Sequence, residues 1–116
     1  MTKKFTLLQL FSIIDGRLST EIGDVYEMLN HITGENLYTH HLPVAMKYIE
    51  EVSPLWFFEL KEHLNEIKKI HGDDFNVLIK EIKQNYNTEF DIPQLRETDK
   101  NDFESYMIDN SLLLNR

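Results

Sequence analysis

The chain contains no cysteine. It can therefore form neither disulfides nor a thiolate zinc site, and it has no cysteine nucleophile. Glycine and proline are also scarce, with four and three among 116 residues, which leaves few turns for a many-stranded β fold. No apolar run approaches the ~20 residues that a membrane-spanning helix needs. These absences favour a helical protein without covalent cross-links.

Acidic residues outnumber basic ones by 20 to 12, for a net charge of −8. Such a charge repels phosphate backbones and favours encounter with a basic protein surface. The first residues are basic, but no small-residue cleavage pattern follows them, so no signal peptide is expected. We predict a cytoplasmic protein that binds a protein partner, with no membrane association and no direct contact with nucleic acid.

Hydrophobic spacing predicts an all-α fold, a single compact domain of about five short helices. The helical segments are 7–14, 22–31, 43–52, 54–70 and 75–86. A strand over the first of them is the alternative. Residues 90–93 alternate too briefly to form more than a short extended segment. We expect a helical domain over 1–95 and a tail over 96–116 that is partly ordered or docks on the body or a partner. Within this tail, Phe103, Tyr106 and Met107 can form one or two helical turns, and residues 112–114 give an apolar patch.

The expected helices have candidate start signals. Thr6 and Gln9 have the spacing of a capping box, in which each side chain hydrogen-bonds the backbone N–H of the other residue. The other candidate N-caps are Ser19 or Thr20, Ser53 and Asp73. Glycine follows several of the segments and is the usual residue at a helix end.

The densest apolar cluster occupies residues 55–58, at the start of the fourth helix. Four consecutive large side chains cannot all face one core, although we expect most of them to be buried. One or two of Leu55, Trp56 and Phe58 therefore pack under a neighbouring loop or mark a contact surface. The sequence favours the covering loop.

No catalytic, metal-binding or cofactor-binding pattern is present. The five histidines lack the spacing of a metalloprotease helix or a two-histidine-one-carboxylate site, and there is no glycine-rich phosphate loop. Glu27, His31 and either His40 or His41 could approach one another across the 34–43 turn as a three-ligand site, but surface or capping histidines are far commoner. We therefore predict that the protein is not an enzyme and carries no cofactor.

Partner contacts are expected on two acidic helix faces, in the 34–43 turn and at the start of the fourth helix. Tyr38 and one neighbouring histidine are the residues in the turn that helix capping leaves unused. The candidate partner-binding residues are Glu21, Asp24, Glu27, Tyr38, His40, His41, Trp56, Phe58, Glu59, Glu62 and Glu66.

Several short motifs occur in the first 45 residues: G-R-L at 16–18, D-x-[YH]-x-x-[LM] at 24–29, T-G at 33–34 and T-H-x-L-P-x-A at 39–45. In this order they resemble a family of small uncharacterised phage and prophage proteins. The resemblance implies a phage-encoded accessory protein in a bacterial host cell, and it carries no activity to transfer.

Three functions follow as hypotheses. The leading one is a non-enzymatic protein that binds a host or phage protein, in the form of an inhibitor of a bacterial defence system, similar to an anti-CRISPR protein, or of a host enzyme. One alternative is a small metal-dependent hydrolase that uses the histidines near the 34–43 turn. The other is a self-associating structural protein, such as a homodimer, that uses Trp56 and Phe58.

Overall fold

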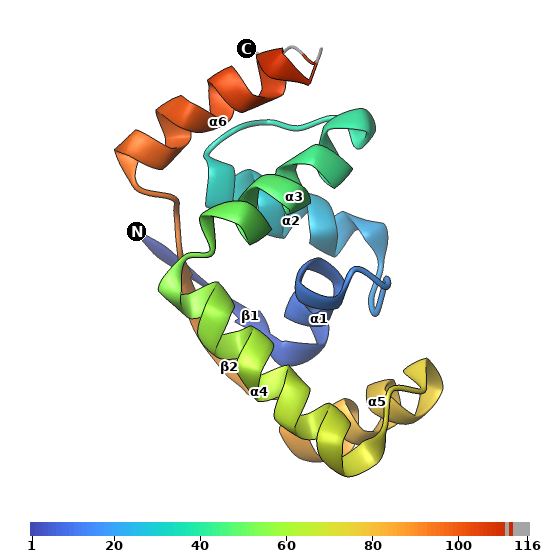
Figure 1. The fold of residues 1–116 in the computed structure, drawn as a ribbon. Helices are drawn as coiled ribbons and strands as arrows, with labels where there is room; N and C mark the ends of the chain where they lie inside the picture. Colours follow the sequence, from blue (N-terminus) through green and yellow to red (C-terminus); the bar gives the residue numbers. More distant parts are fainter. Residues whose placement is uncertain (111, 113–116) are drawn as a thin grey trace.

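The structure is a computed structural model and describes residues 1–110 and 112. Its elements follow one another as shown in Figure 1. They are β1 (Thr2–Thr6), α1 (Leu7–Asp15), α2 (Ile22–Thr33), the 3-10 turn η1 (Thr39–His41), α3 (Leu42–Val52), α4 (Leu55–His71), α5 (Phe75–Glu81), the π-helical turn η2 (Ile82–Tyr86), β2 (Glu89–Pro93) and α6 (Glu97–Asp109).

The two strands form a small antiparallel sheet that joins distant parts of the chain. Phe5 lies opposite Phe90, and Lys3 lies opposite Ile92. The extended segment at 90–93 is confirmed, but its partner β1 was not predicted. The fold of the described residues is therefore mostly helical, as predicted, with six α-helices where about five were predicted. The small sheet means that the all-α class is wrong.

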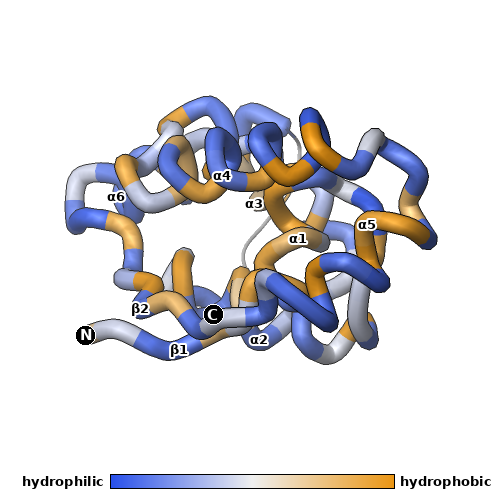
Figure 2. The backbone as a smooth tube through the Cα atoms, turned by 90° about the horizontal axis from the view of Figure 1, so that it is seen from below, coloured by the Kyte–Doolittle hydropathy of each residue, from blue (hydrophilic) through white to orange (hydrophobic). Residues whose placement is uncertain are grey.

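Helix α1 lies at the centre of the core. Its start is the predicted capping box: the Gln9 N–H donates to Thr6 Oγ1 at 3.2 Å, and the Thr6 N–H donates to Gln9 Oε1 at 2.9 Å. Gly16 ends the helix in the left-handed region, at φ 95°, where a side chain would be strained. Figure 2 shows the hydrophobic colouring of α1, which packs against α2, α4 and η2.

The predicted N-caps of α2 are wrong, and for Ser19 the reason is a set of contacts with α1. Ser19 hydrogen-bonds the Ser12 hydroxyl and the Leu8 carbonyl, and α2 begins after Glu21 without a side-chain cap. Thr20 Oγ1 is buried with no hydrogen-bond partner among the described residues.

The two remaining cap predictions fail at either end of α4. Ser53 ends α3 in the left-handed region, at φ 47°, and does not cap α4. Helix α5 is capped by Asp74, which accepts from the Val77 N–H at 3.1 Å, while Asp73 pairs with Arg17.

Helix α6 forms most of the predicted tail and packs against α3. It is a full 13-residue helix rather than one or two turns. Phe103 and Met107 are completely buried, and the Tyr48 hydroxyl of α3 donates to the Asp99 carbonyl at 2.7 Å. Residues 113 and 114 of the predicted apolar patch lie outside the described residues. Within the described part, no helix has the length and apolar character to cross a membrane.

Candidate protein-binding surfaces

The outer face of α4 combines exposed apolar and acidic side chains. The opposite face of the helix is buried through Phe57, Leu60, Leu64 and Ile67. Because successive helical residues are separated by about 100°, Leu55, Phe58, Glu59, Glu62 and Glu66 project outward. Leu55 and Phe58 are 72% and 54% exposed, so the predicted covering loop over them is wrong. We call these five residues the α4 outer face.

Two carboxylates of this face form no direct pair with a described residue, although Glu62 adds to the effect of Glu66 in raising the pKa of Lys69. Glu59 and Glu62 make no hydrogen bond or ion pair within the described part of the chain, whereas Glu66 pairs with Lys69 at 2.9 Å. Exposed carboxylates that are not neutralised internally remain available to a basic partner. The α4 outer face is therefore an apolar patch that continues into an acidic one.

Trp56 lies beside this face rather than on it. It is half-buried and lines two hollows of about 570 and 370 Å³. The larger hollow lies between the start of α4 and the link from β2 to α6, and the smaller one lies between α4 and β2. Glu59 lines both hollows, so Trp56 adjoins the outer face through this carboxylate.

The acidic residues predicted as a contact face on α2 are less available to a partner than those on α4. Glu27 pairs with Lys3 of β1 at 2.8 Å, and Asp24 is half-buried in the first turn of the helix. Glu21 is exposed and precedes the helix as its N-cap. Within this predicted face, the carboxylate of Glu27 is therefore already paired with a lysine of the same chain.

The 34–43 turn places only some of its candidates at the surface. His41 is fully buried, and its Nδ1 accepts the Tyr38 N–H at 2.8 Å. The rings of Tyr38 and His41 stack with centroids 5.8 Å apart and an interplanar angle of 11°. Tyr38 and His40 remain exposed, which leaves one histidine of the pair at the surface.

The histidines do not converge on a metal site. His31 Nε2 lies 2.7 Å from the Ile92 carbonyl oxygen and so links α2 to β2. No group of three or more His, Asp or Glu side chains that could hold a metal occurs among residues 1–110 and 112. The roles found for His31 and His41 are contacts within the fold.

An apolar groove of about 650 Å³ opens between α1, the start of α2 and α3. Leu18 and Ile22, which are 50% and 51% exposed, form part of its wall. Ile22 shares the apolar spacing of Val25 and Leu29 on α2, but at the first position of this helix it is half exposed. The groove is lined by Ser12, Ile13, Ile14, Asp15, Gly16, Leu18, Ile22, Val25, Thr39, Leu42, Pro43, Met46, Lys47, Glu50 and Glu51.

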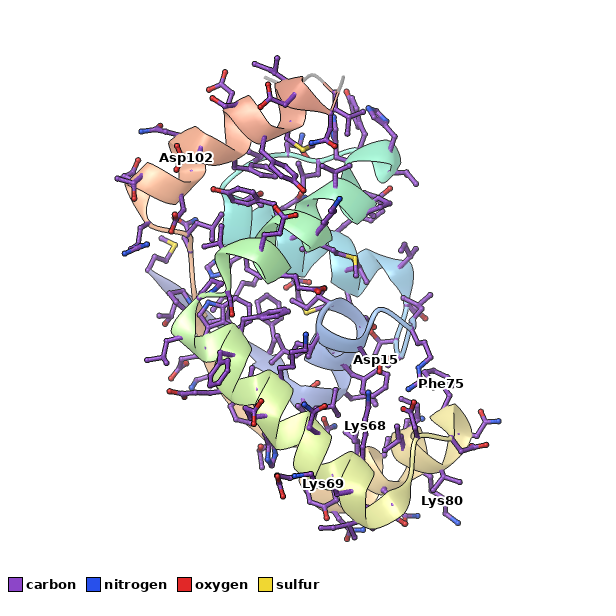
Figure 3. The ribbon with its side chains drawn as sticks, in the orientation of Figure 1. Asp15, Lys68, Lys69, Phe75, Lys80 and Asp102 are labelled. Atoms are coloured by element: carbon purple, nitrogen blue, oxygen red, sulfur yellow. The ribbon has the colours of Figure 1, made fainter. Side chains whose placement is uncertain are left out.

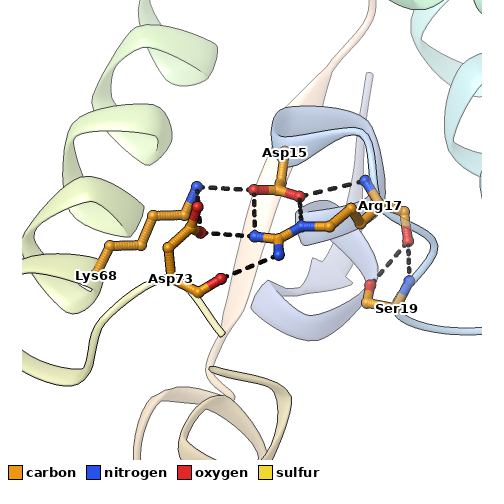
Figure 4. Close-up of polar contacts among 6 residues, drawn as sticks. Asp15, Arg17, Ser19, Lys68 and Asp73 are labelled. Carbon is orange, nitrogen blue, oxygen red and sulfur yellow. Dashed lines mark hydrogen bonds and ion pairs between the residues drawn. The ribbon is translucent and has the colours of Figure 1, made fainter. Parts of the chain in front are cut away.

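An ion cluster borders this groove at Asp15, whose carboxylate is only 6% exposed. Arg17 Nε and Lys68 Nζ each donate to it at 2.7 Å, and Arg17 also pairs with Asp73 at 2.7 Å (Figure 4). Burial alone would raise the pKa of Asp15, but the hydrogen bonds from Arg17 and Lys68 outweigh it and lower this pKa to about 2. The cluster ties the α1–α2 link to the end of α4.

Lys68 of this cluster and its neighbour Lys69 lie on different sides of α4 and pair with different carboxylates. Figure 3 shows Lys68 on the side of the helix nearer Asp15, whereas Lys69 points away. Both lysines have carboxylate partners, Asp15 for Lys68 and Glu66 for Lys69. The lysines at the end of α4 are therefore paired internally and do not form a free basic patch.

Residues 5–63 match a family described as a domain of unknown function, DUF7736. The chain belongs to this family. Comparisons with curated proteins and with solved structures give no match. An uncharacterised family was predicted from the sequence motifs, and this part of the prediction is confirmed. The DUF7736 segment runs from the end of β1 into α4, so it includes the whole groove and most of the α4 outer face.

Proposed function

We propose that the protein acts by binding another protein and is not an enzyme. The observation that carries this proposal is the α4 outer face, where Leu55 and Phe58 stand exposed next to the unpaired Glu59 and Glu62. Protein interfaces are built around apolar and aromatic anchors surrounded by polar groups, and aromatic residues are enriched at them. The face has this composition.

The partner is a protein with a basic surface that surrounds an apolar pocket. Phe58 is the anchor that enters the pocket, and Glu59 and Glu62 face lysine or arginine. The net charge of −8 steers such a partner toward the protein, and the association rate falls as salt rises.

The biological setting is part of the same proposal. The motifs at 16–18, 33–34 and 39–45 support a phage-encoded accessory protein that works in the cytoplasm of the host cell. An acidic protein of this size is suited to occupy a basic nucleic-acid groove in place of nucleic acid. We therefore propose an inhibitor of a bacterial defence system or of a host enzyme.

The test is affinity purification of the tagged protein from infected host cells at low and high salt. We expect a protein partner that is retained by the wild type, released by salt and lost from the double variant Glu59→Lys, Glu62→Lys. The matched control is Glu97→Lys, Asp102→Lys, which changes the net charge equally on α6 and is expected to retain the partner. The proposal fails if no retained protein responds to both salt and the α4 variant.

Self-association is the second candidate, because the exposed Leu55 and Phe58 could equally cover a second copy. Size-exclusion chromatography of the wild type and of Phe58→Asp separates the two functions. A wild-type dimer that becomes monomeric in Phe58→Asp supports self-association, and a wild-type monomer excludes it.

A further inference from the structure

We propose that the groove between α1 and α3 binds an amphipathic helix of a partner protein, with basic residues at the end that faces Glu50. This second site is separate from the α4 outer face. It rests on the proposed protein-binding function only in that its occupant is also a protein.

The shape of the groove favours a helix over a small molecule. Its volume of about 650 Å³ is within the range of ligand pockets, but its walls at Leu18 and Ile22 are half exposed. Small-molecule sites enclose most of the ligand surface, which these open walls cannot do. An amphipathic helix instead lays a row of apolar side chains into an open groove and keeps its polar face in water.

Helix α3 supplies one long wall of the groove. Pro43, Met46, Lys47, Glu50 and Glu51 all line it, and they recur at the three- and four-residue spacing of one helical stripe. The wall is therefore apolar near the start of α3 and charged toward its end. A partner helix lying along α3 meets these two parts in order.

The charged residues on this wall determine which charges a bound helix can carry at its ends. Lys47 and Glu50 are exposed and form no ion pair with any described residue. Glu51 lies beside Tyr106 of α6, whose pKa is raised by burial and by this carboxylate. The other acid in the lining, Asp15, is neutralised by Arg17 and Lys68. Among the described residues, Glu50 is thus the acid of the groove that has no partner. A basic residue of the bound helix is favoured next to Glu50 and disfavoured next to Lys47.

The experiment uses the full chain and two synthetic helical peptides labelled with a fluorophore. Both carry leucine at i, i+3, i+4 and i+7. One has arginines in its terminal turn, and the other has glutamates at the same positions. Fluorescence anisotropy at low salt gives each Kd, and chemical-shift changes in ¹⁵N-labelled protein locate the bound peptide.

We expect the arginine peptide to bind with shift changes at Leu18, Ile22 and Met46, and the glutamate peptide to bind at least tenfold more weakly. Ile22→Glu, which puts a charge on the wall, is expected to weaken binding by about tenfold or more. The matched control is Ile108→Glu on α6, because Ile108 is 55% exposed and lies outside the groove. Glu50→Lys weakens binding of the arginine peptide, and Lys47→Glu strengthens it. Circular dichroism checks that each variant is folded.

Four results overturn the proposal. The first is equal affinity for the two peptides, and the second is shift changes confined to the α4 outer face. The third is a wild-type dimer that Ile22→Glu dissociates, since the occupant would then be a second copy of this chain. The fourth is that neither peptide binds the protein. If a cellular partner still depends on Glu59 and Glu62 in that case, the groove is excluded and the proposed function stands.

Discussion

Helix α4 carries two pairs of identical neighbours whose members face opposite environments. Phe57 is buried and Phe58 is exposed near the start of the helix. Near its end, the Lys68 side chain is 25% exposed and bound to Asp15, whereas the Lys69 side chain is 72% exposed. Neighbours in a helix point about 100° apart, so position on the helix, and not residue type, decides between core and surface.

The inward and outward residues have different roles at the two ends of α4. At the start, the inward phenylalanine completes the core and the outward one leaves apolar area in water. At the end, the inward lysine neutralises a nearly buried carboxylate, and the outward one forms a surface pair with Glu66. Phe57 and Lys68 thus hold the two ends of the helix to the fold, whereas Phe58 at its start is left available for recognition.

The phenylalanine pair gives the largest expected effect. Phe57→Ala should lower the free energy of unfolding by about 3–5 kcal/mol, because it removes a buried aromatic ring and leaves a cavity. Phe58→Ala should change it by no more than about 1 kcal/mol, because more than half of that residue is already exposed. Urea denaturation followed by circular dichroism measures both, and comparable losses in the two variants would contradict the assignment of Phe58 to the surface.

A substitution of Asp15 measures how much its ion pairs at the end of α4 contribute to stability. Asp15→Asn removes the carboxylate shared by Arg17 and Lys68, and we expect a loss of about 2 kcal/mol at neutral pH. The matched control is Glu66→Gln, which removes an exposed pair and should cost no more than about 0.5 kcal/mol.

The pH dependence of the same variant follows from its pKa. Folding lowers the pKa of Asp15 from the ordinary 3.8 to about 2. The stabilisation is therefore fully present above the unfolded value and is lost as pH falls through the folded one. The difference in stability between the wild type and Asp15→Asn should shrink between pH 4 and pH 2, as measured by urea denaturation at each pH. A difference that stays constant over this range would rule out the paired carboxylate as its source.

Much of the helical core could be predicted from periodicity alone. The buried face of α4 follows the three- and four-residue spacing of its apolar side chains, and the Thr6–Gln9 capping box at the start of α1 is a local signal. These predictions succeeded because the interactions involved lie within one or two helical turns.

The predictions that failed depend on distant partners. Strand β1 contains Lys3 and Lys4 and acquires its structure from residues 89–93, at the other end of the domain. Ser19 and Asp73 had the right chemistry for capping, but Ser12 and Arg17 hold them elsewhere. A local pattern cannot indicate which of two hydrogen-bond partners a side chain will meet.

The same distinction between local and distant contacts explains which candidate surface was predicted from the sequence. Phe58, Glu59 and Glu62 were named from the sequence, because a run of large side chains followed by acids on one helix is a local pattern. The groove was missed, since Leu18, Ile22 and Met46 come from three segments that only the fold brings together. Ile22 fits the apolar spacing of α2, so this spacing alone does not indicate that it lies at the surface.

Substitutions of Lys68 and Lys69 should give the smallest changes in stability, and they compare the inward and outward sides of α4 most directly. Lys68→Met should cost about 1 kcal/mol, because Asp15 keeps its hydrogen bonds from Arg17 and loses only one charged donor. Lys69→Met should cost less than about 0.5 kcal/mol. In double-mutant cycles with Asp15→Asn, Lys68 should show a coupling energy of about 0.5–1 kcal/mol and Lys69 none. Equal coupling for both lysines would mean that the charge of Asp15 acts through solvent rather than through its contact with Lys68, and this contact would then not be what holds the end of α4.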